Sequence, residues 1–187
     1  ATAMSFSPGP NTTLSTTLAA NGGLPRAMRF IFAVPVGWSL LLCLCAAGIG
    51  ALILAAPALR IAVQTLGIGY LLYLAWKLAG SSTLASAKDA PLQVGFWQGV
   101  ALQFLNIKAW LLALTIVAGW IAGQADALHR FAIVVPVMLV FAFASNFAYA
   151  LAGALLRNWL SKGRRLLWFN RAMALVLVLT AYWMVRI

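Results

Sequence analysis

A lysine and two side-chain amides stand inside a long apolar run in the second half of the chain. Gln103 and Asn106 are three residues apart and so share one face of a helix, and Lys108 lies more than a helical turn from either end of the run. A lysine at the middle of a membrane costs roughly 2.5–3.5 kcal/mol to insert, so its ammonium should face a cavity or a partner. No Asp or Glu occurs inside any apolar run, which leaves backbone carbonyls, water or a bound carboxylate as that partner. A lysine at a helix end that snorkels to the membrane surface is the alternative.

The first apolar run carries a second polar interruption. It reads Ser7-Pro8-Gly9-Pro10-Asn11 and continues with several hydroxyl side chains, Ser15 among them. Two prolines around a glycine break the helical hydrogen-bond ladder, and carbonyls freed in hydrocarbon must find partners or line a wet cavity. Proline followed by Asn and Thr is also typical of a helix start, whose free N–H groups attract anions. A tight turn at the membrane surface is the alternative.

A third polar set lies in the fifth apolar run, where Asn146 and Tyr149 again share a helix face and Ser145 precedes them. These side chains either line the same cavity or form hydrogen bonds between helices. The sequence therefore predicts a binding site near the membrane midplane. Its candidate residues are Pro8, Pro10, Asn11, Ser15, Gln103, Asn106, Lys108, Asn146 and Tyr149.

The composition requires a membrane around these residues. Of the 187 residues, 64% are hydrophobic and 8% are charged, whereas a soluble domain carries roughly 25% charged residues. A soluble protein of this size would lack the polar surface to cover its core. Since about 20 apolar residues span a bilayer, the chain has room for roughly six spans and no extramembrane domain. We therefore expect one all-α domain over residues 1–187, a polytopic membrane helix bundle.

Glycine, proline and polar residues divide the chain into six apolar segments. The expected membrane helices cover residues 3–20, 31–55, 61–79, 94–122, 131–156 and 166–185. Three helices followed by three more give the second half the opposite orientation, which is the geometry of a 3+3 inverted repeat. The polar interruptions fall in the first helix of each half, which favours this interpretation. The chain begins without an initiator methionine, so an incomplete N-terminus is compatible with the sequence.

Charge and cysteine usage exclude several function classes. The net charge is +11, with Asp89 and Asp126 as the only acidic residues. The basic residues stand mainly at the ends of the apolar runs, so we expect contacts with anionic lipid headgroups and no nucleic acid. Cys43 and Cys45 are two residues apart and match neither a zinc site nor a CxxC pair. With no histidine cluster and no carboxylate in the membrane either, the sequence predicts no metal, no cofactor and no enzymatic activity. A homo-oligomer is compatible with it.

Three motifs in order make nearly the whole chain resemble the LysE/RhtB family of bacterial amino-acid exporters. Pro8-Gly9-Pro10-Asn11 is similar to the family's PGPN signature, and the stretch from Gly67 to Lys77 is similar to its third-helix pattern of Gly, Tyr-Leu and Lys. Asn106-Ile107-Lys108-Ala109 is similar to its NPKA motif, with Ile107 where proline is usual. That replacement removes a helix-breaking residue, so the sequence leaves open whether the fourth helix has a sharp break there.

The resemblance implies a secondary transporter that exports small amino acids or their derivatives from the cytoplasm, driven by the proton gradient. Within the family, residues 101–108 and 146–153 look most like the cysteine/O-acetylserine exporter branch. It also implies a multi-pass protein of the bacterial inner membrane, and functional roles at the two motifs that contain Asn11 and Lys108. A structural or assembly subunit without transport is the alternative, although such a subunit needs no lysine beside amides inside the membrane.

Basic residues are unevenly divided between the two sides of the predicted bundle. Nine lie in or beside the odd-numbered loops and three lie in the even-numbered loops or at the C-terminus. The nine are Arg26, Arg29, Lys77, Lys88, Arg157, Lys162, Arg164, Arg165 and Arg171, and the three are Arg60, Arg130 and Arg186. Because Lys and Arg accumulate in cytoplasmic loops, the odd loops are expected in the cytoplasm and both termini outside it.

Fusion reporters test this orientation. A reporter that is active only in the cytoplasm should be active when fused after Arg165 and silent when fused after Arg186, because the two points lie on opposite sides of the membrane. Reporter activity per unit of fusion protein in the membrane is the measurement. The reverse pattern would overturn the assignment.

Overall fold

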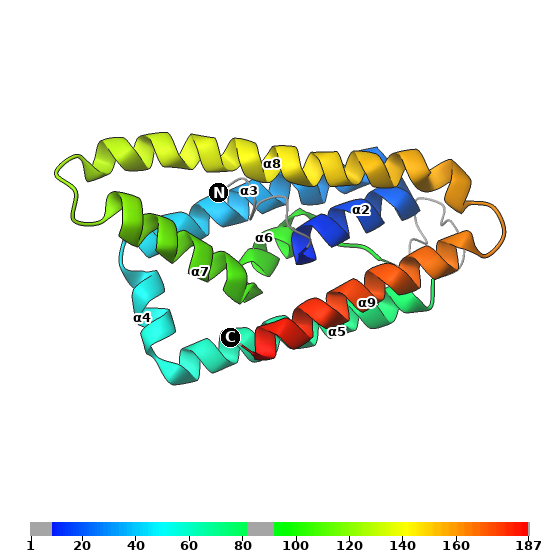
Figure 1. Cartoon of the computed structure of the whole chain (residues 1–187), viewed down its shortest axis with the longest axis horizontal. Helices are drawn as coiled ribbons and strands as arrows, with labels where there is room; N and C mark the ends of the chain where they lie inside the picture. The colour runs from blue at the N-terminus through cyan, green and yellow to red at the C-terminus, as the bar shows by residue number, and fades with distance from the viewer. Residues whose placement is uncertain (1–8, 82–91, 187) are drawn as a thin grey trace.

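The computed structural model describes residues 9–81 and 92–186, and every regular element within these ranges is a helix. The expected all-α polytopic bundle is therefore confirmed (Figure 1). The elements are α2 (Pro10–Gly22), α3 (Leu24–Ala46), α4 (Ile49–Ala55), α5 (Pro57–Ala79), α6 (Phe96–Leu105), α7 (Ile107–Ile116), the π-helical turn η1 (Val117–Ile121), α8 (Ala127–Leu160) and α9 (Arg165–Val185).

Up to five segments in the described ranges are long and apolar enough to span a membrane. The helices α3, α5, α8 and α9 are each long and apolar enough to cross a bilayer, and the bent unit from α6 to η1 gives a fifth. The first expected span, residues 3–20, is described only from residue 9, and its helix α2 has 13 residues. Pro8 lies outside the described residues.

The second expected span differs from the prediction at both ends. Helix α3 begins at Leu24, well before residue 31, because Pro25 occupies its first turn, where a missing N–H leaves no hydrogen bond unmade. The connection between α2 and α3 is the single residue Gly23, which adopts a positive φ of 84°. At the other end Gly48, with φ 83°, ends the helix, and α4 continues in a new direction (Figure 1). The expected segment 31–55 is thus two helices.

The fourth expected span is also two helices, with a bend of 71° between α6 and the unit from α7 to η1. The break falls at Asn106, whose backbone is extended at φ −97° and ψ 95°. The fourth helix is therefore broken although Ile107 stands where proline is usual, and the contacts that stabilise the break are described with the site below.

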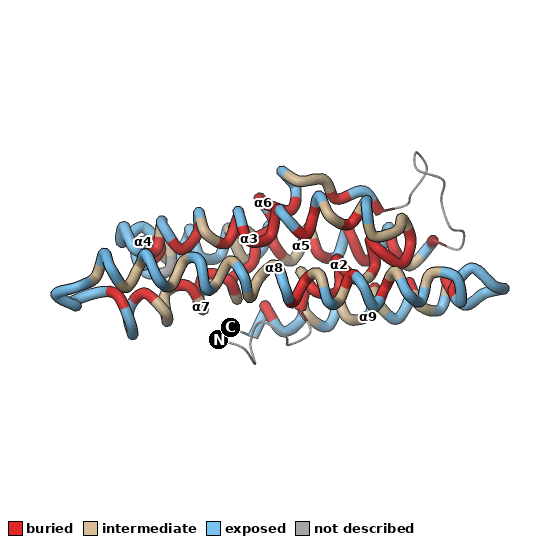
Figure 2. Tube along the Cα trace, turned by 90° about the horizontal axis from the view of Figure 1, so that it is seen from above, coloured by how far each residue is buried: buried red, intermediate tan, exposed pale blue. Residues whose placement is uncertain are grey.

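Helices of the first half of the chain pack against helices of the second half. The first helix of one half meets the second helix of the other, since α2 packs against α8 and α3 packs against α6 and α7. The third helices of the two halves, α5 and α9, pack against each other. This pattern is the one that an inverted repeat would produce. Figure 2 shows the buried residues along the inner faces where these helices meet, with exposed residues on the outer faces.

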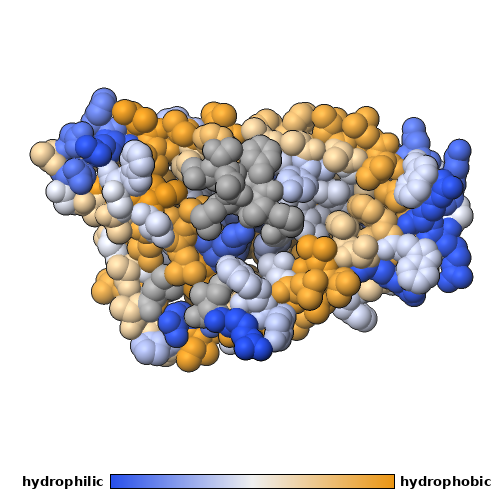
Figure 3. Space-filling view, viewed as in Figure 1, coloured by the Kyte–Doolittle hydropathy of each residue, from blue (hydrophilic) through white to orange (hydrophobic). Residues whose placement is uncertain are grey.

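The outer surface has the polarity of a membrane protein. In Figure 3 hydrophilic side chains gather at the two ends of the long axis and at the lower edge, and much of the remaining surface is apolar. Trp76, Trp97, Trp120 and Trp168 are each at least 60% exposed, as is typical of tryptophans near the ends of membrane spans. The α2–α3 and α8–α9 connections, which carry much of the larger basic set, lie at the same end of the bundle (Figure 1).

Glycine allows the closest contacts between helices. A Cβ atom at Gly67 of α5 would overlap the Leu105 carbonyl oxygen at the end of α6, and one at Gly153 of α8 would overlap the Thr16 carbonyl oxygen of α2. Small residues let helix backbones approach in lipid, where no hydrophobic effect drives helices together. The two glycines therefore fix how near α5 and α8 lie to the broken helices.

Substitution of Gly67 by alanine should destabilise the bundle, with Gly69→Ala as the matched control. Both changes favour the helix by up to about 1 kcal/mol. A Cβ at Gly69, however, meets no atom within 4 Å, whereas one at Gly67 meets the Leu105 carbonyl. Overpacking typically costs 1–3 kcal/mol. Thermal unfolding of the purified protein in detergent should show a lower midpoint for Gly67→Ala and an unchanged or higher one for Gly69→Ala. Equal midpoints would contradict the tight contact.

Candidate functional site

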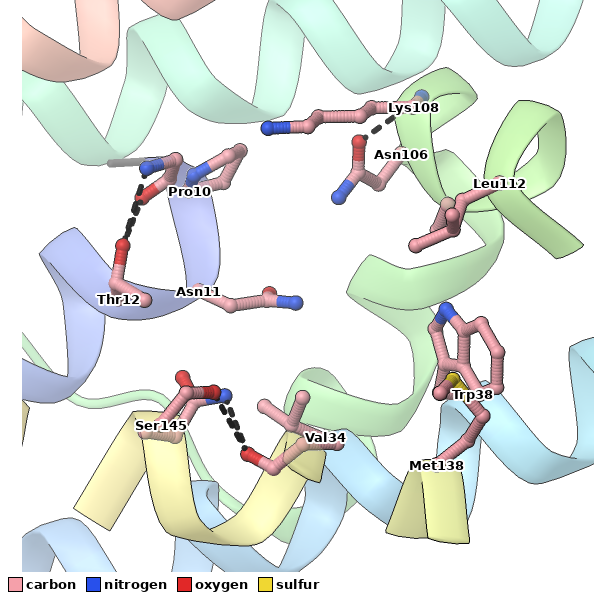
Figure 4. Close-up of a pocket in the computed structure, with 14 residues that line it drawn as sticks. Pro10, Asn11, Thr12, Val34, Trp38, Asn106, Lys108, Leu112, Met138 and Ser145 are labelled. Atoms are coloured by element: carbon pink, nitrogen blue, oxygen red, sulfur yellow. Dashed lines mark hydrogen bonds between the residues drawn. The ribbon is translucent and has the colours of Figure 1, made fainter. Parts of the chain in front are cut away.

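A cavity of about 100 Å³ lies at the centre of the bundle (Figure 4). The starts of α2 and α7 form one part of its wall, and the middle turns of α3 and α8 form the rest. Six polar residues line it: Asn11, Thr12, Asn106, Lys108, Ser145 and Asn146. The other lining residues are Gly9, Pro10, Val34, Trp38, Ala109, Leu112, Met138 and Ala142. The space suits a ligand of a few heavy atoms.

Helix α2 starts at this cavity because of the sequence Gly9-Pro10. Gly9 is extended and serves as the N-cap, and Pro10 occupies the first turn. The Thr12 hydroxyl accepts a hydrogen bond from the Gly9 N–H at 3.0 Å and donates one to the Gly9 carbonyl at 3.2 Å. Gly9 and Pro10 are buried and line the cavity. This favours an interrupted helix over a tight turn at the membrane surface.

Helix α7 starts at the same cavity through an asparagine cap. The Asn106 side-chain oxygen accepts a hydrogen bond from the Lys108 backbone N–H at 3.2 Å, as expected of a preferred N-cap residue. The Trp110 indole donates to the Phe104 carbonyl at 2.9 Å, which satisfies an acceptor freed by the break. Gly67 leaves room for the next carbonyl, that of Leu105. Cap, indole and glycine together stabilise the bend without a proline.

The cavity has a positive electrostatic character. The N-terminal ends of α2 and α7 both border it, and the N-terminal end of a helix carries roughly half a positive charge. Lys108, the second residue of α7, is half-buried, and in Figure 4 its side chain extends toward Pro10. No acidic side chain is among the lining residues. Such an arrangement favours an anionic group.

In the described part of the chain, the only acidic residue lies far from this cavity, at the start of α8. Asp126 forms a 2.6 Å ion pair with Arg130, one helical turn further on. The hydrogen bond from Arg130 holds the pKa of this carboxyl below its usual value. Asp126 therefore stays ionised at neutral pH and is poorly suited to carry a proton.

Two predicted site residues lie behind the cavity and hold those that line it. Asn11 and Gln103 exchange reciprocal amide hydrogen bonds of 2.8 and 3.1 Å, and Gln103 is fully buried. The Ser15 hydroxyl donates to the Asn146 side-chain oxygen at 2.8 Å. These bonds connect α2 to α6 and to α8. The alternative reading of Asn146 as an interhelical hydrogen-bonding residue therefore holds, although Asn146 also lines the cavity.

The nine predicted site residues thus fall into four groups. Five of them line the cavity: Pro10, Asn11, Asn106, Lys108 and Asn146. Ser15 and Gln103 support it from behind. Tyr149 is half-buried one turn along α8 and does not line the cavity, and Pro8 lies outside the described residues.

An apolar wall that sequence reasoning missed faces the polar groups. Val34, Trp38, Leu112 and Met138 line it, and Figure 4 shows Trp38 and Met138 close together. Trp38 is only 8% exposed. The expected span began at residue 31, which put Trp38 near its start. From the true start at Leu24, Trp38 falls past the middle of α3.

The fold and the cavity define a multi-pass membrane protein with a small polar cavity among its helices. The family model of the LysE type translocators matches residues 2–186, so the chain belongs to that family and is a membrane transporter rather than an enzyme. It is 33% identical to the cysteine/O-acetylserine efflux protein of Salmonella typhi and 32% identical to that of Escherichia coli (strain K12). Each comparison covers 94% of this chain and 89% of the relative. No solved structure shows a significant match. The bacterial relatives and the apolar helices together place the protein in the inner membrane.

A double-mutant cycle tests the amide pair behind the cavity. Asn11→Ala and Gln103→Ala should be coupled by about 0.6–1.7 kcal/mol, the range of hydrogen bonds between membrane helices. The matched control pairs Asn11→Ala with Asn170→Ala, because Asn170 bonds to Asn21, ten residues along α2. Sites that share no partner should add without coupling. Free energies of unfolding in mixed micelles give both values. Equal coupling in the two cycles would contradict the pairing.

Proposed function

We propose that the protein exports a small neutral amino acid, or a derivative of one, from the cytoplasm and binds it as a zwitterion in the central cavity. The observation that carries the proposal is the meeting of two helix starts and Lys108 at one cavity whose described lining contains no acidic residue. Membership of a translocator family supports a transport role, and relatives named as cysteine/O-acetylserine efflux proteins support an amino-acid substrate.

The substrate carboxylate is assigned to the side of the cavity formed by α2 and α7. The Lys108 ammonium would form a charge-assisted hydrogen bond with it, which is about twice as strong as a neutral one. The first-turn N–H groups of both helices add donors and the positive ends of two helix dipoles. Both helices begin within the lining of the cavity, at Gly9 and at Asn106. This is the geometry that broken helices provide for anionic substrate groups in other secondary transporters.

The substrate ammonium is assigned to the side formed by α8. Ser145 offers its hydroxyl oxygen, and the Asn146 side-chain oxygen keeps one lone pair beyond its bond from Ser15. Both residues are at most 3% exposed, so they are shielded from lipid and available to a molecule inside the cavity. The ammonium therefore meets neutral acceptors rather than a carboxylate.

The side chain of the substrate is assigned to the apolar wall of Trp38, Leu112 and Met138. A short side chain that is apolar or carries sulfur or an ester suits this surface, since thioether and indole groups make favourable contacts with sulfur and carbon. A lysine or arginine substrate would bring a second positive charge beside Lys108 and find no acidic partner in the lining. The wall thus favours neutral substrates.

The orientation expected from the basic residues is part of the same proposal. With the odd loops in the cytoplasm, the α2–α3 and α8–α9 connections face the cytoplasm and the α7–α8 connection faces outside (Figure 1). A structural subunit without transport is the second candidate. It leaves unexplained why this member of a translocator family has a polar cavity among its helices.

Replacement of Lys108 by methionine should abolish export without loss of membrane insertion. The change removes an insertion cost of roughly 2.5–3.5 kcal/mol, so the variant should reach at least the wild-type level in the membrane. Lys108→Arg keeps the charge but alters the donor geometry and should reduce export rather than abolish it. Export of cysteine and O-acetylserine from cells with matched membrane levels is the measurement.

Two variants serve as controls for Lys108. Lys77 is exposed at the end of α5, with its ammonium 5.3 Å from the centroid of the Tyr73 ring, so Lys77→Met should leave export near normal. Asp126→Asn removes an ionised group at the membrane surface and should also leave export largely intact. Full export by Lys108→Met, or equal losses of export in the Lys77 and Lys108 variants, would show that Lys108 does not bind the substrate. Loss of export in Asp126→Asn would overturn the account of that carboxylate.

A further inference from the structure

A second cavity, of about 440 Å³, lies far from the central one, at the hairpin between α8 and α9. Its apolar part consists of Leu156, Leu160 and Phe169. Trp159 and Trp168 stand beside them, and Arg164 and Arg165 close the end that faces away from the bundle. The cleft is therefore amphipathic, with a hydrocarbon-like part along the helices and a cationic part at their ends.

The hairpin itself positions the two arginines. Gly163 has a φ of 62°, a left-handed conformation that allows the chain to turn tightly between α8 and α9. The Arg165 guanidinium lies 4.6 Å from the centroid of the Trp159 ring and donates a hydrogen bond to the Trp159 carbonyl at 3.4 Å. Cation–π stacking and this hydrogen bond orient the guanidinium, whose planar fork suits phosphate oxygens.

The charge of this cleft has no acidic counterpart in the described part of the chain. Asp126, the only carboxylate side chain there, is already bonded to Arg130 at the connection between η1 and α8, which lies at the opposite end of the bundle (Figure 1). Arg164 and Arg165 are exposed, so their charges are open to a ligand outside the protein. The cleft therefore attracts an anion.

Its position decides which anion. Trp159 and Trp168 are 54% and 60% exposed and stand at the ends of two membrane helices. Tryptophans at helix ends typically lie at the depth of the lipid headgroups. A soluble anion would leave the apolar part of the cleft without a partner. A phospholipid would fill both parts, since its phosphate would meet the arginines and an acyl chain would lie along Leu156 and Phe169.

We propose that the α8–α9 cleft is a binding site for an anionic phospholipid. Basic pockets between membrane helices bind anionic headgroups in general, and here two arginines, two tryptophans and an apolar floor come from one hairpin. The site is independent of the central cavity, and it does not require that the protein exports an amino acid.

The test compares two double variants of the purified full-length protein in zwitterionic detergent. Arg164→Gln with Arg165→Gln removes the cationic part of the cleft. Arg26→Gln with Arg29→Gln removes the same charge from the start of α3, at the same end of the bundle (Figure 1). Native mass spectrometry measures the retention of phosphatidylglycerol and phosphatidylcholine, and thermal unfolding is followed with each lipid and with inorganic phosphate.

We expect wild type and the α3 variant to retain phosphatidylglycerol in preference to phosphatidylcholine and to be stabilised by it. The cleft variant should bind phosphatidylglycerol about 25-fold more weakly, at roughly fivefold per basic residue near an anionic headgroup. Arg164→Lys with Arg165→Lys shows whether charge alone suffices, and it should retain intermediate binding. If both glutamine variants lost phosphatidylglycerol binding equally, the binding would depend on general surface charge and not on the cleft. Stabilisation by inorganic phosphate alone, without lipid preference, would overturn the assignment to a lipid.

Discussion

The structure depends on one constraint, which is that backbone groups released inside a membrane need partners within the protein. Hydrocarbon offers no hydrogen bonds, and each unmatched backbone group costs several kcal/mol. Helices α2 and α7 both begin at the central cavity, so their first N–H groups meet this constraint there. Local caps satisfy part of it, through Thr12 in α2 and Asn106 in α7. The cavity takes the rest, because it can hold water or a ligand. The cavity that satisfies these backbone groups is therefore also the proposed binding site.

The remaining contacts hold the two helix starts against each other. In lipid, helices associate through close packing and interhelical hydrogen bonds, because no hydrophobic effect separates one helix from another. Gly153 brings α8 against α2, and Gly67 brings α5 against the break after α6. The reciprocal amides of Asn11 and Gln103 join α2 to α6. A rearrangement that separates α2 from α6 must break this pair, while one that separates α2 from α8 must break the bond between Ser15 and Asn146.

A second pair of side-chain amides joins two helices by reciprocal hydrogen bonds away from the cavity. Asn21 and Asn170 exchange hydrogen bonds of 2.8 and 3.0 Å, and Asn170 also donates to the Ser81 carbonyl at 3.1 Å. Both asparagines are almost fully buried. The pair joins the end of α2 to the first turns of α9, so α2 is held at its two ends by amides from different helices. Neutral amides suit this task because each both donates and accepts, and no net charge is buried.

The sequence predicted the polar centre of the site because polar residues are conspicuous in apolar runs. Asn11, Asn106 and Lys108 stood out for this reason, and the structure brings them to one cavity. Spacing alone does not distinguish a residue that lines a cavity from one that supports it, so Ser15 and Gln103 were predicted without their actual role. Apolar lining residues such as Met138 were missed because nothing distinguishes them from residues that face lipid.

Helix boundaries were predicted less well, and the reasons are local. Pro25 was read as part of a loop although proline is favoured in the first turn of a helix. Gly48 was read as part of a span, yet its positive φ ends α3. The sequence left the break at Asn106 open because Ile107 stands where proline is usual. An asparagine cap and the Trp110 indole maintain it, and both are local contacts that depend on the bent backbone conformation.

The charge distribution of the central site suits a transporter that must release what it binds. On the proposed binding mode the carboxylate meets Lys108 and two helix dipoles, while the ammonium meets only hydroxyl and amide oxygens. A carboxylate side chain placed opposite Lys108 would pair with it in the empty state, and the substrate would then have to break a buried ion pair, which is costly. No carboxylate belongs to the described lining, so on this binding mode the substrate carboxylate reaches Lys108 without displacing a buried acidic side chain. Since neutral hydrogen bonds between membrane helices average only about 0.6 kcal/mol, the ammonium is held weakly. The anionic end thus determines where the substrate sits, and the weakly held cationic end lets it leave.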